Sequence, residues 1–184
     1  IIVLTSFLVT LFSQTNNSQY GQWHKEATRL YDLEEPTEQT DSTALALFLK
    51  VAEMAGSTDK ELAIDCCIKA GNIHQGYRRF DDANKLYHYA LYLNNQFVKS
   101  NSVKYEAFLY LGSSLYFSNV IDSAQHYFEA ASAIAINNPG DKHLPEQDRL
   151  YNSLGAIYYE SANFQQAKNY FEKALLVTSP SIDE

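Results

Sequence analysis

One glycine-centred pattern occurs three times along this chain, and it constrains the fold more than any other feature of the sequence. When the sequence is aligned on Gly71, Gly112 and Gly155, the same residue types recur at the same distances after each glycine. An alanine stands twelve residues on, an aromatic residue sixteen on and a second alanine nineteen on: Ala83, Tyr87 and Ala90; Ala124, Phe128 and Ala131; Ala167, Phe171 and Ala174. The glycines are 41 and then 43 residues apart, a spacing typical of stacked supersecondary units.

Each copy of the pattern contains two blocks of apolar residues at helical spacing, with a short polar break between them. The breaks cover residues 78–82, 118–122 and 161–163. Connections this short force two helices to lie antiparallel, so each copy is predicted to be a helical hairpin. The N-cap of the second helix is expected to be Asp81 or Asp82 in the first copy and Asp122 or Ser123 in the second. These side chains can accept hydrogen bonds from the first turn of a helix.

The predicted fold class is therefore all-α, an array of antiparallel helix pairs. Residues 60–184 are expected to hold three repeats, and residues 20–59 a degenerate first repeat with Trp23 in its first helix and Phe48 in its second. The recurring glycines indicate close helix packing, because glycine otherwise costs a helix about 0.5 to 1 kcal/mol. The expected helices cover residues 22–34, 42–55, 62–76, 82–95, 103–117, 121–136, 147–161 and 164–177.

The third copy carries a resemblance to the tetratricopeptide repeat. The family's residue types stand at Tyr151, Leu154, Gly155, Tyr158, Ala167, Phe171 and Ala174, and Pro180 lies near the expected terminal proline. The resemblance covers about residues 60 to 184 and implies a right-handed superhelical solenoid. The repeats here are longer than the family's by about seven to nine residues, and the excess falls in residues 94–103 and 137–147. Longer second helices and longer loops between repeats both fit this excess.

The first residues have the composition of an export signal. Residues 1–12 are apolar apart from two threonines and a serine, and a polar run follows Ser13, the candidate cleavage point. Residues 1–19 are therefore expected to be a signal peptide and linker, which predicts an exported or periplasmic protein. A buried N-terminal helix, part of a longer membrane anchor and a cytoplasmic location are the alternatives.

The composition excludes several classes of function. A formal charge of −8 without a Lys/Arg cluster argues against nucleic acid and an anionic membrane surface as partners. Cys66 and Cys67 point about 100° apart on a helix and are expected to be buried, not paired with each other. No phosphate loop, Gly-x-Ser-x-Gly or His-Glu-x2-His motif occurs, so neither an enzyme nor a small-molecule substrate is expected. Neither a metal nor a cofactor is expected, because the histidines are scattered singly: His24, His74, His88, His126 and His143.

The resemblance implies an interaction scaffold that binds a peptide or a partner protein in a concave groove. The second hypothesis is a sensory or regulatory array of a larger bacterial protein, because the extended repeats are similar to those that precede a CHAT-type, caspase-like protease or a sensor kinase. The effector would then follow Glu184. The last predicted helix lacks a polar capping face, so a further repeat or a second copy of the chain is expected to cover it.

The first helix of each repeat is expected to face the groove. The side chains placed on its surface by steps of three and four residues are Asp65, Ile68, Asn72 and Gln75; Glu106, Leu109, Ser113 and Tyr116; and Arg149, Asn152, Ala156 and Tyr159. Family members that hold a C-terminal carboxylate use several Lys, Arg and Asn side chains, and only Asn72 and Arg149 match here. We therefore expect an extended peptide or a partner loop, held by aromatic contacts and hydrogen bonds. The alternative is that Tyr116 and Tyr159 pack between repeats and that no groove ligand exists.

Overall fold

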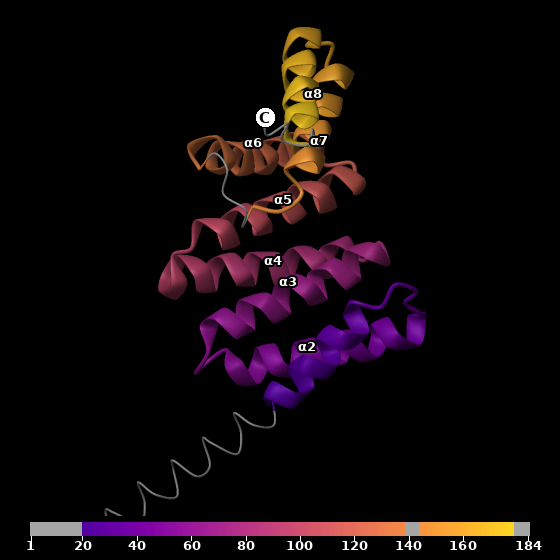
Figure 1. Ribbon diagram of the computed structural model, residues 1–184, viewed down its shortest axis with the longest axis vertical. Coiled ribbons are helices and arrows are strands. Elements are labelled where there is room, and N and C mark those ends of the chain that lie inside the picture. The colour runs from indigo at the N-terminus through magenta and orange to yellow at the C-terminus, as the bar shows by residue number, and fades with distance from the viewer. Residues whose placement is uncertain (1–19, 139–143, 179–184) are drawn as a thin grey trace, which may run out of the picture.

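The protein is a stack of antiparallel helix pairs, shown in Figure 1. The computed structural model describes residues 20–138 and 144–178, and these ranges contain helices and no strand. The all-α prediction and the superhelical repeat architecture are therefore confirmed. After a helix over residues 20–31 come α2 (Glu38–Ala55), α3 (Lys60–Gly76), α4 (Phe80–Leu93), the π-helix η1 (Asn94–Val98), α5 (Asn101–Phe117), α6 (Ile121–Asn137), α7 (Gln147–Glu160) and α8 (Phe164–Thr178).

The helix ends differ most from the prediction in the first pair. The first helix ends at residue 31 and α2 begins at Glu38, whereas 34 and 42 were expected. The cause is a capping box at the start of α2. The Thr37 hydroxyl accepts a hydrogen bond from the Thr40 backbone N–H, and the Thr40 hydroxyl accepts one from the Thr37 N–H.

The recurring glycine of each repeat lies directly against the recurring aromatic ring. The three pairs are Gly71 with Tyr87, Gly112 with Phe128, and Gly155 with Phe171. In every pair, a Cβ atom on the glycine would lie 2.5 to 2.6 Å from a ring carbon, which is closer than van der Waals contact allows. The two recurring alanines of each copy are buried beside the ring. The glycines therefore let the two helices of a pair pack closely, which is the packing role that their recurrence predicted.

The turn inside each repeat has the same backbone conformation in all three copies. Arg78, Asn119 and Ala162 each stand seven residues after the repeat's glycine, and each has a φ angle between 58° and 64°. This left-handed residue reverses the chain, and the second helix begins two positions later. The predicted N-caps are therefore wrong: the N-cap positions of α4 and α6 are Arg79 and Val120, without a side-chain cap. The aspartates of the prediction lie in the first turns instead, where a carboxylate still stabilises the helix dipole.

The residues that lengthen the first of these repeats form a π-helix and a turn. After α4, the chain continues as the π-helix η1 and then turns at Lys99, whose φ angle is 59°. The buried Asn94 fixes this turn, because its side chain donates to the Ser100 carbonyl oxygen and accepts from the Ser100 N–H, both at 2.9 Å. After α6, a connection leads to α7, and its residues 139–143 lie outside the described ranges. After α4, the excess residues therefore extend the second helix of the repeat.

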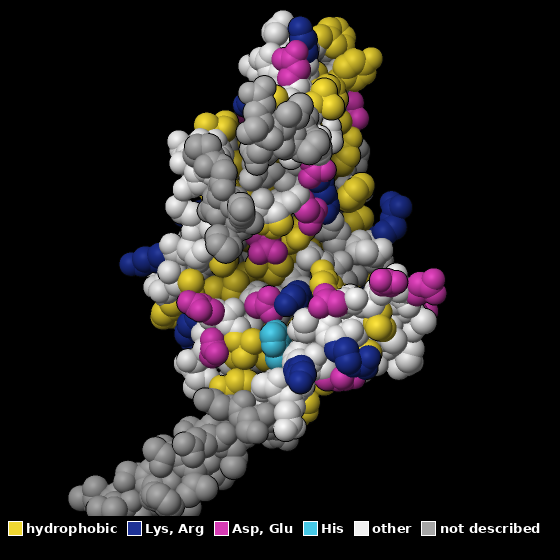
Figure 2. Space-filling model, viewed as in Figure 1, with side chains coloured by type: hydrophobic (Ala, Val, Ile, Leu, Met, Phe, Trp, Pro, Cys, Tyr) yellow, Lys and Arg dark blue, Asp and Glu magenta, His cyan; other side chains and the backbone are white. Residues whose placement is uncertain are grey.

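The last helix leaves an apolar strip uncovered. Phe171, Leu175, Leu176 and Val177 of α8 are 38%, 66%, 75% and 45% exposed. In Figure 2, hydrophobic side chains lie along the right-hand edge of the α7 and α8 pair. No helix within residues 20–138 and 144–178 is both long and apolar enough to cross a membrane. The predicted signal segment 1–19, His143 and Pro180 lie outside the described residues.

Candidate functional site

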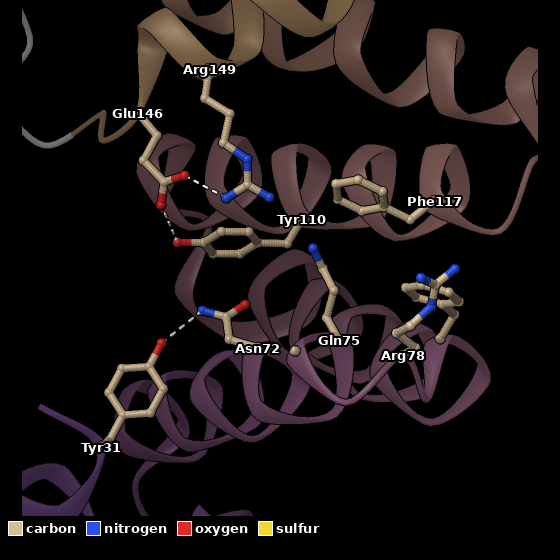
Figure 3. Close-up of a pocket in the computed structure, with 10 residues that line it drawn as sticks. Tyr31, Asn72, Gln75, Arg78, Tyr110, Phe117, Glu146 and Arg149 are labelled. Atoms are coloured by element: carbon tan, nitrogen blue, oxygen red, sulfur yellow. Dashed lines mark hydrogen bonds and ion pairs between the residues drawn. The ribbon is translucent and has the colours of Figure 1, made fainter. Parts of the chain in front are cut away.

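One cavity is formed by residues from successive helix pairs. It has a volume of about 540 Å³ and lies between α3, α5 and the segment that enters α7. Its walls mix aromatic rings, amides and guanidinium groups: Tyr31, Asn72, Gln75, Gly76, Arg78, Phe80, Tyr110, Phe117, Glu146 and Arg149. Figure 3 shows these side chains converging on one space from opposite sides. We call this space the larger cavity.

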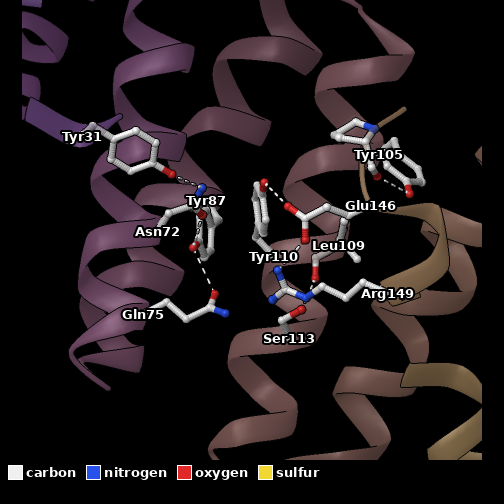
Figure 4. A network of polar contacts seen from close by, with 11 residues as sticks. Tyr31, Asn72, Gln75, Tyr87, Tyr105, Leu109, Tyr110, Ser113, Glu146 and Arg149 are labelled. Carbon is white, nitrogen blue, oxygen red and sulfur yellow. Dashed lines mark hydrogen bonds and ion pairs between the residues drawn. The ribbon is translucent and has the colours of Figure 1, made fainter. Parts of the chain in front are cut away.

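A hydrogen-bond network forms the floor of the larger cavity (Figure 4). The Asn72 side chain donates to the Tyr31 hydroxyl at 3.2 Å and accepts from the Tyr87 hydroxyl at 2.8 Å. Tyr87 also contacts Gln75 Oε1 at 3.1 Å. Asn72 therefore links the first helix, α3 and α4, and its side chain is already satisfied within the protein. The Gln75 amide nitrogen, in contrast, points into the cavity in Figure 3.

The opposite wall of the larger cavity contains a charged group that is already neutralised. Arg149 Nη1 lies 2.6 Å from Glu146 Oε2, and the Tyr110 hydroxyl donates to the other oxygen of that carboxylate at 3.1 Å. The Arg149 guanidinium also lies 5.8 Å from the centre of the Tyr110 ring. Arg78, on the α3 side, forms no ion pair with any described residue. Arg78 is therefore the cation of this cavity that an incoming group can engage.

A second cavity, of about 350 Å³, lies further toward the start of α3. We call it the smaller cavity. It is lined by Glu61, Ile64, Asp65, Ile68, Val98, Ser100, Val103 and Glu106. Asp65 is held by two partners, since His24 Nε2 lies 2.8 Å and Lys69 Nζ 2.9 Å from its carboxylate. Burial, reinforced by the charge of Asp65, raises the pKa of Glu106 to about 7. The two cavities together are called the α3 groove below.

The structure brings six of the twelve predicted groove residues to the α3 groove. Asn72, Gln75 and Arg149 line the larger cavity, and Asp65, Ile68 and Glu106 line the smaller one. Whether these residues bind a ligand stays a prediction.

Two predicted groove residues are in the protein interior instead. Leu109 and Ser113 of α5 are 0% and 3% exposed, and the Ser113 hydroxyl donates to the Leu109 carbonyl oxygen. This part of the prediction is wrong, because α5 packs between neighbours and is apolar on nearly every side. Stepping by three and four residues along a helix assumes one exposed face, which α5 lacks in this part.

The predicted residues of the last repeat do not gather in either cavity, apart from Arg149. Asn152 is exposed, Ala156 is partly buried, and Tyr159 is 61% exposed with its ring against Phe164. Tyr116 of the preceding repeat donates a hydrogen bond to Glu160 at 3.1 Å. Tyr116 thus bridges two repeats, as the alternative hypothesis expected, whereas Tyr159 packs within its own.

Of the ten residues that line the larger cavity, the sequence pattern predicted only Asn72, Gln75 and Arg149. Arg78, Phe80 and Phe117 flank the turns within repeats, which the sequence pattern marked only as polar breaks. An aromatic residue beside each of two successive turns was the signal for this contact. Phe80 and Phe117 stack across the two turns, with ring centroids 6.5 Å apart. The other missed residues are Tyr31, Gly76, Tyr110 and Glu146.

Both cysteines are buried, as predicted, and they are not paired. Burial raises the pKa of each thiol to about 12. The ligand atoms of His24, Asp65 and Cys66 lie within 4.8 Å of one another, an arrangement that the scattered histidines did not predict. Because Lys69 already neutralises Asp65 and the thiol is protonated, we assign these contacts to the packing of the first helix on α3.

Comparisons with known proteins agree with this architecture. Residues 105–175 match the tetratricopeptide repeat family, and the fold is that of a tetratricopeptide solenoid, so the resemblance is confirmed. No curated protein sequence matches the chain.

Solved structures share the fold at low sequence identity. The chain is similar to BtubC (BKLC) from P. vanneervenii, with 15% identity, a TM-score of 0.65, and 95% of this chain and 80% of that one covered. It is similar to MamA, with 20% identity, a TM-score of 0.63 and coverage of 92% and 82%. The TPR domain of Arabidopsis FLU has 19% identity, a TM-score of 0.55 and coverage of 64% and 95%.

Proposed function

We propose that this protein is an interaction scaffold that holds an extended segment of a partner protein in the α3 groove. The observation that carries the proposal is the larger cavity, whose walls come from the first helix, α3, α5 and the start of α7. A site shared by successive repeats is long enough for several residues of a bound chain. Proteins of this fold typically mediate protein–protein interaction, which is consistent with such a site.

The chemistry of the larger cavity suits a peptide. Phe117 is 57% exposed and, with Phe80, offers an apolar surface to a side chain. The Gln75 amide and the Arg78 guanidinium can donate hydrogen bonds to backbone carbonyl oxygens of an extended segment. Exposed aromatic and arginine side chains beside polar groups are typical of the residues that dominate binding free energy in protein interfaces.

The proposal includes no catalysis. A cysteine nucleophile needs a lowered thiol pKa, and burial raises the pKa of Cys66 and Cys67 to about 12. The His24 and Asp65 pair is tied to Lys69 and to the packing of two helices.

Panning a random-peptide phage library on the purified protein tests this function. Selected peptides are expected to lose at least about tenfold in affinity on replacement of Phe117 or Arg78 by Ala, because each provides a central contact. Tyr92→Ala is the matched control, since Tyr92 is 55% exposed on α4 and lines neither cavity. Failure to select any peptide, or selected peptides that ignore Phe117 and Arg78, would contradict the proposal.

A second proposal is that the array belongs to a larger bacterial protein with a CHAT-type protease or sensor kinase after Glu184. The exposed apolar strip on α8 favours it, because the positions equivalent to Phe171 and Leu175 are buried in each preceding repeat, where the next helix follows. The reading frame after Glu184 decides this point. A frame that ends there would rule the proposal out.

A further inference from the structure

The smaller cavity combines an apolar floor with an acidic rim. Ile64 and Ile68 of α3 are 2% and 4% exposed, so they form its base. Val98 and Val103 close it from the side of η1 and α5. Its lining includes three carboxylates and no lysine or arginine. In Figure 2, acidic side chains likewise lie beside hydrophobic ones across the middle of the molecule. A cavity of this kind is complementary to a side chain that is apolar along its length and cationic at its end.

The carboxylates of the rim are not equally satisfied. Asp65 is paired with Lys69 and His24. Glu106 lies across the cavity on α5, partly buried, and forms no hydrogen bond or ion pair with a described residue. A partly buried carboxylate without a partner is unfavourable in its charged form. Glu106 therefore gains more than Asp65 from an incoming cation.

Building on the peptide-binding role proposed above, we infer that the smaller cavity receives a lysine or arginine side chain of the bound segment. The methylene groups of that side chain pack on Ile64 and Ile68, and its cationic end contacts Glu106. An apolar side chain would leave Glu106 unpaired, and an acidic one would be repelled by the whole rim.

The geometry of α3 also gives the position of this basic residue in the segment. Ile68 in the smaller cavity and Gln75 in the larger one lie two helical turns apart, or about 10 Å. An extended chain covers that distance in about three residues. The basic residue is thus expected about three positions from the residue of the segment that contacts Gln75.

Binding of the basic side chain is coupled to a proton. Burial raises the pKa of Glu106 to about 7, the charges of Asp65 and Glu146 raise it further, and Lys69 lowers it. A bound cation favours the charged carboxylate, so binding releases a proton from Glu106 near neutral pH. Affinity for a lysine-containing segment therefore rises as the pH increases toward about 8 and levels off above it.

Peptides selected by the phage panning described above provide the test. Replacing the selected lysine by norleucine, which keeps the apolar chain and removes the charge, is expected to lower affinity about tenfold. Glu106→Gln should cause a similar loss with the lysine peptide, no further loss with the norleucine peptide, and no remaining pH dependence. Glu61→Gln, at the exposed rim, should cause a smaller loss. Glu172→Gln, on the exposed side of α8, is the control and should change nothing.

The outcomes separate this inference from the function on which it rests. If affinity depends on Phe117 and Arg78 while the lysine and norleucine peptides bind equally, the lysine subsite is wrong and the peptide groove stands. If no selected peptide depends on Phe117 or Arg78, the groove itself is wrong. If circular dichroism shows that the Glu106→Gln variant is unfolded, the affinities of the lysine and norleucine peptides for the unmodified protein still test the lysine subsite.

Discussion

The central repeat (α5 and α6) and the last repeat (α7 and α8) contain the same internal contact in different surroundings. Phe128 lies against Gly112 and is 0% exposed, because the next pair covers it. Phe171 lies against Gly155 at the same distance and is 38% exposed. The glycine and ring are therefore properties of one repeat, whereas the burial of the ring depends on the neighbour. A repeat of this protein completes its core only with the helix that follows.

The largest expected difference between the two repeats is the cost of removing the ring. Phe128→Ala should lower the free energy of unfolding by about 3–5 kcal/mol, because it leaves a cavity enclosed on all sides. Phe171→Ala should cost only about 1–2 kcal/mol, because part of its ring is already in water. Urea denaturation followed by circular dichroism measures both. Equal losses would show that the neighbouring helix adds nothing to the core of the repeat.

Adding a methyl group to the glycine tests the same contact in the opposite direction. Gly112→Ala places a Cβ atom 2.6 Å from a carbon of the enclosed Phe128 ring, and this overpacking should cost about 1–3 kcal/mol. In the last repeat, Gly155→Ala meets a ring that can move toward solvent. The alanine then also gains about 0.5–1 kcal/mol of helix propensity, so the change should be near zero. A larger loss in Gly155→Ala than in Gly112→Ala would reverse the comparison.

These contacts also show what the sequence could predict. The spacing of Gly112, Phe128 and their counterparts predicted the helix pairs and most helix ends, because a repeated packing contact leaves a repeated pattern. The same spacing failed at Leu109 and Ser113, because burial of the central helix depends on both neighbouring pairs. Only three of the ten residues that line the larger cavity were predicted, for a related reason. Tyr31 and Glu146 lie outside the glycine-centred pattern, and only the folding of the chain brings them to the cavity.

The central repeat also contains a partly buried carboxylate without an ion-pair partner, whereas the group at the same position of the last repeat is paired. Glu106 of α5 has a pKa raised by burial from 4.5 to about 7, whereas Arg149 of α7, its counterpart, is paired with Glu146. A raised pKa means that the folded protein binds the proton more tightly than the unfolded chain. The stability that this proton provides is complete below about pH 4.5 and is lost as the pH rises to about 7.

Glu106→Gln removes this dependence. The variant should be more stable than the unmodified protein by about 1–2 kcal/mol at about pH 8 and equally stable at about pH 4. Glu172→Gln in the last repeat serves as the control and should leave the pH profile unchanged. Urea denaturation at several pH values gives the comparison. A Glu106→Gln variant that is less stable at high pH would show that the carboxylate is satisfied by a contact that the structure does not contain.

The smallest expected difference concerns the turn, where the central repeat has Asn119 and the last repeat has Ala162. Both residues have φ angles near 60°, and the backbone hydrogen bonds are the same: the left-handed residue bonds to the carbonyl three positions back, and the next residue to the carbonyl five positions back. Asparagine tolerates this conformation, whereas the Cβ atom of alanine is strained in it.

Ala162→Gly should therefore stabilise the protein by about 0.5–1 kcal/mol. Asn119→Gly should change the stability less, because asparagine already fits. Thermal denaturation of the two variants side by side would detect the difference, and a lower melting temperature for Ala162→Gly would mean that the alanine contributes packing which outweighs its strain.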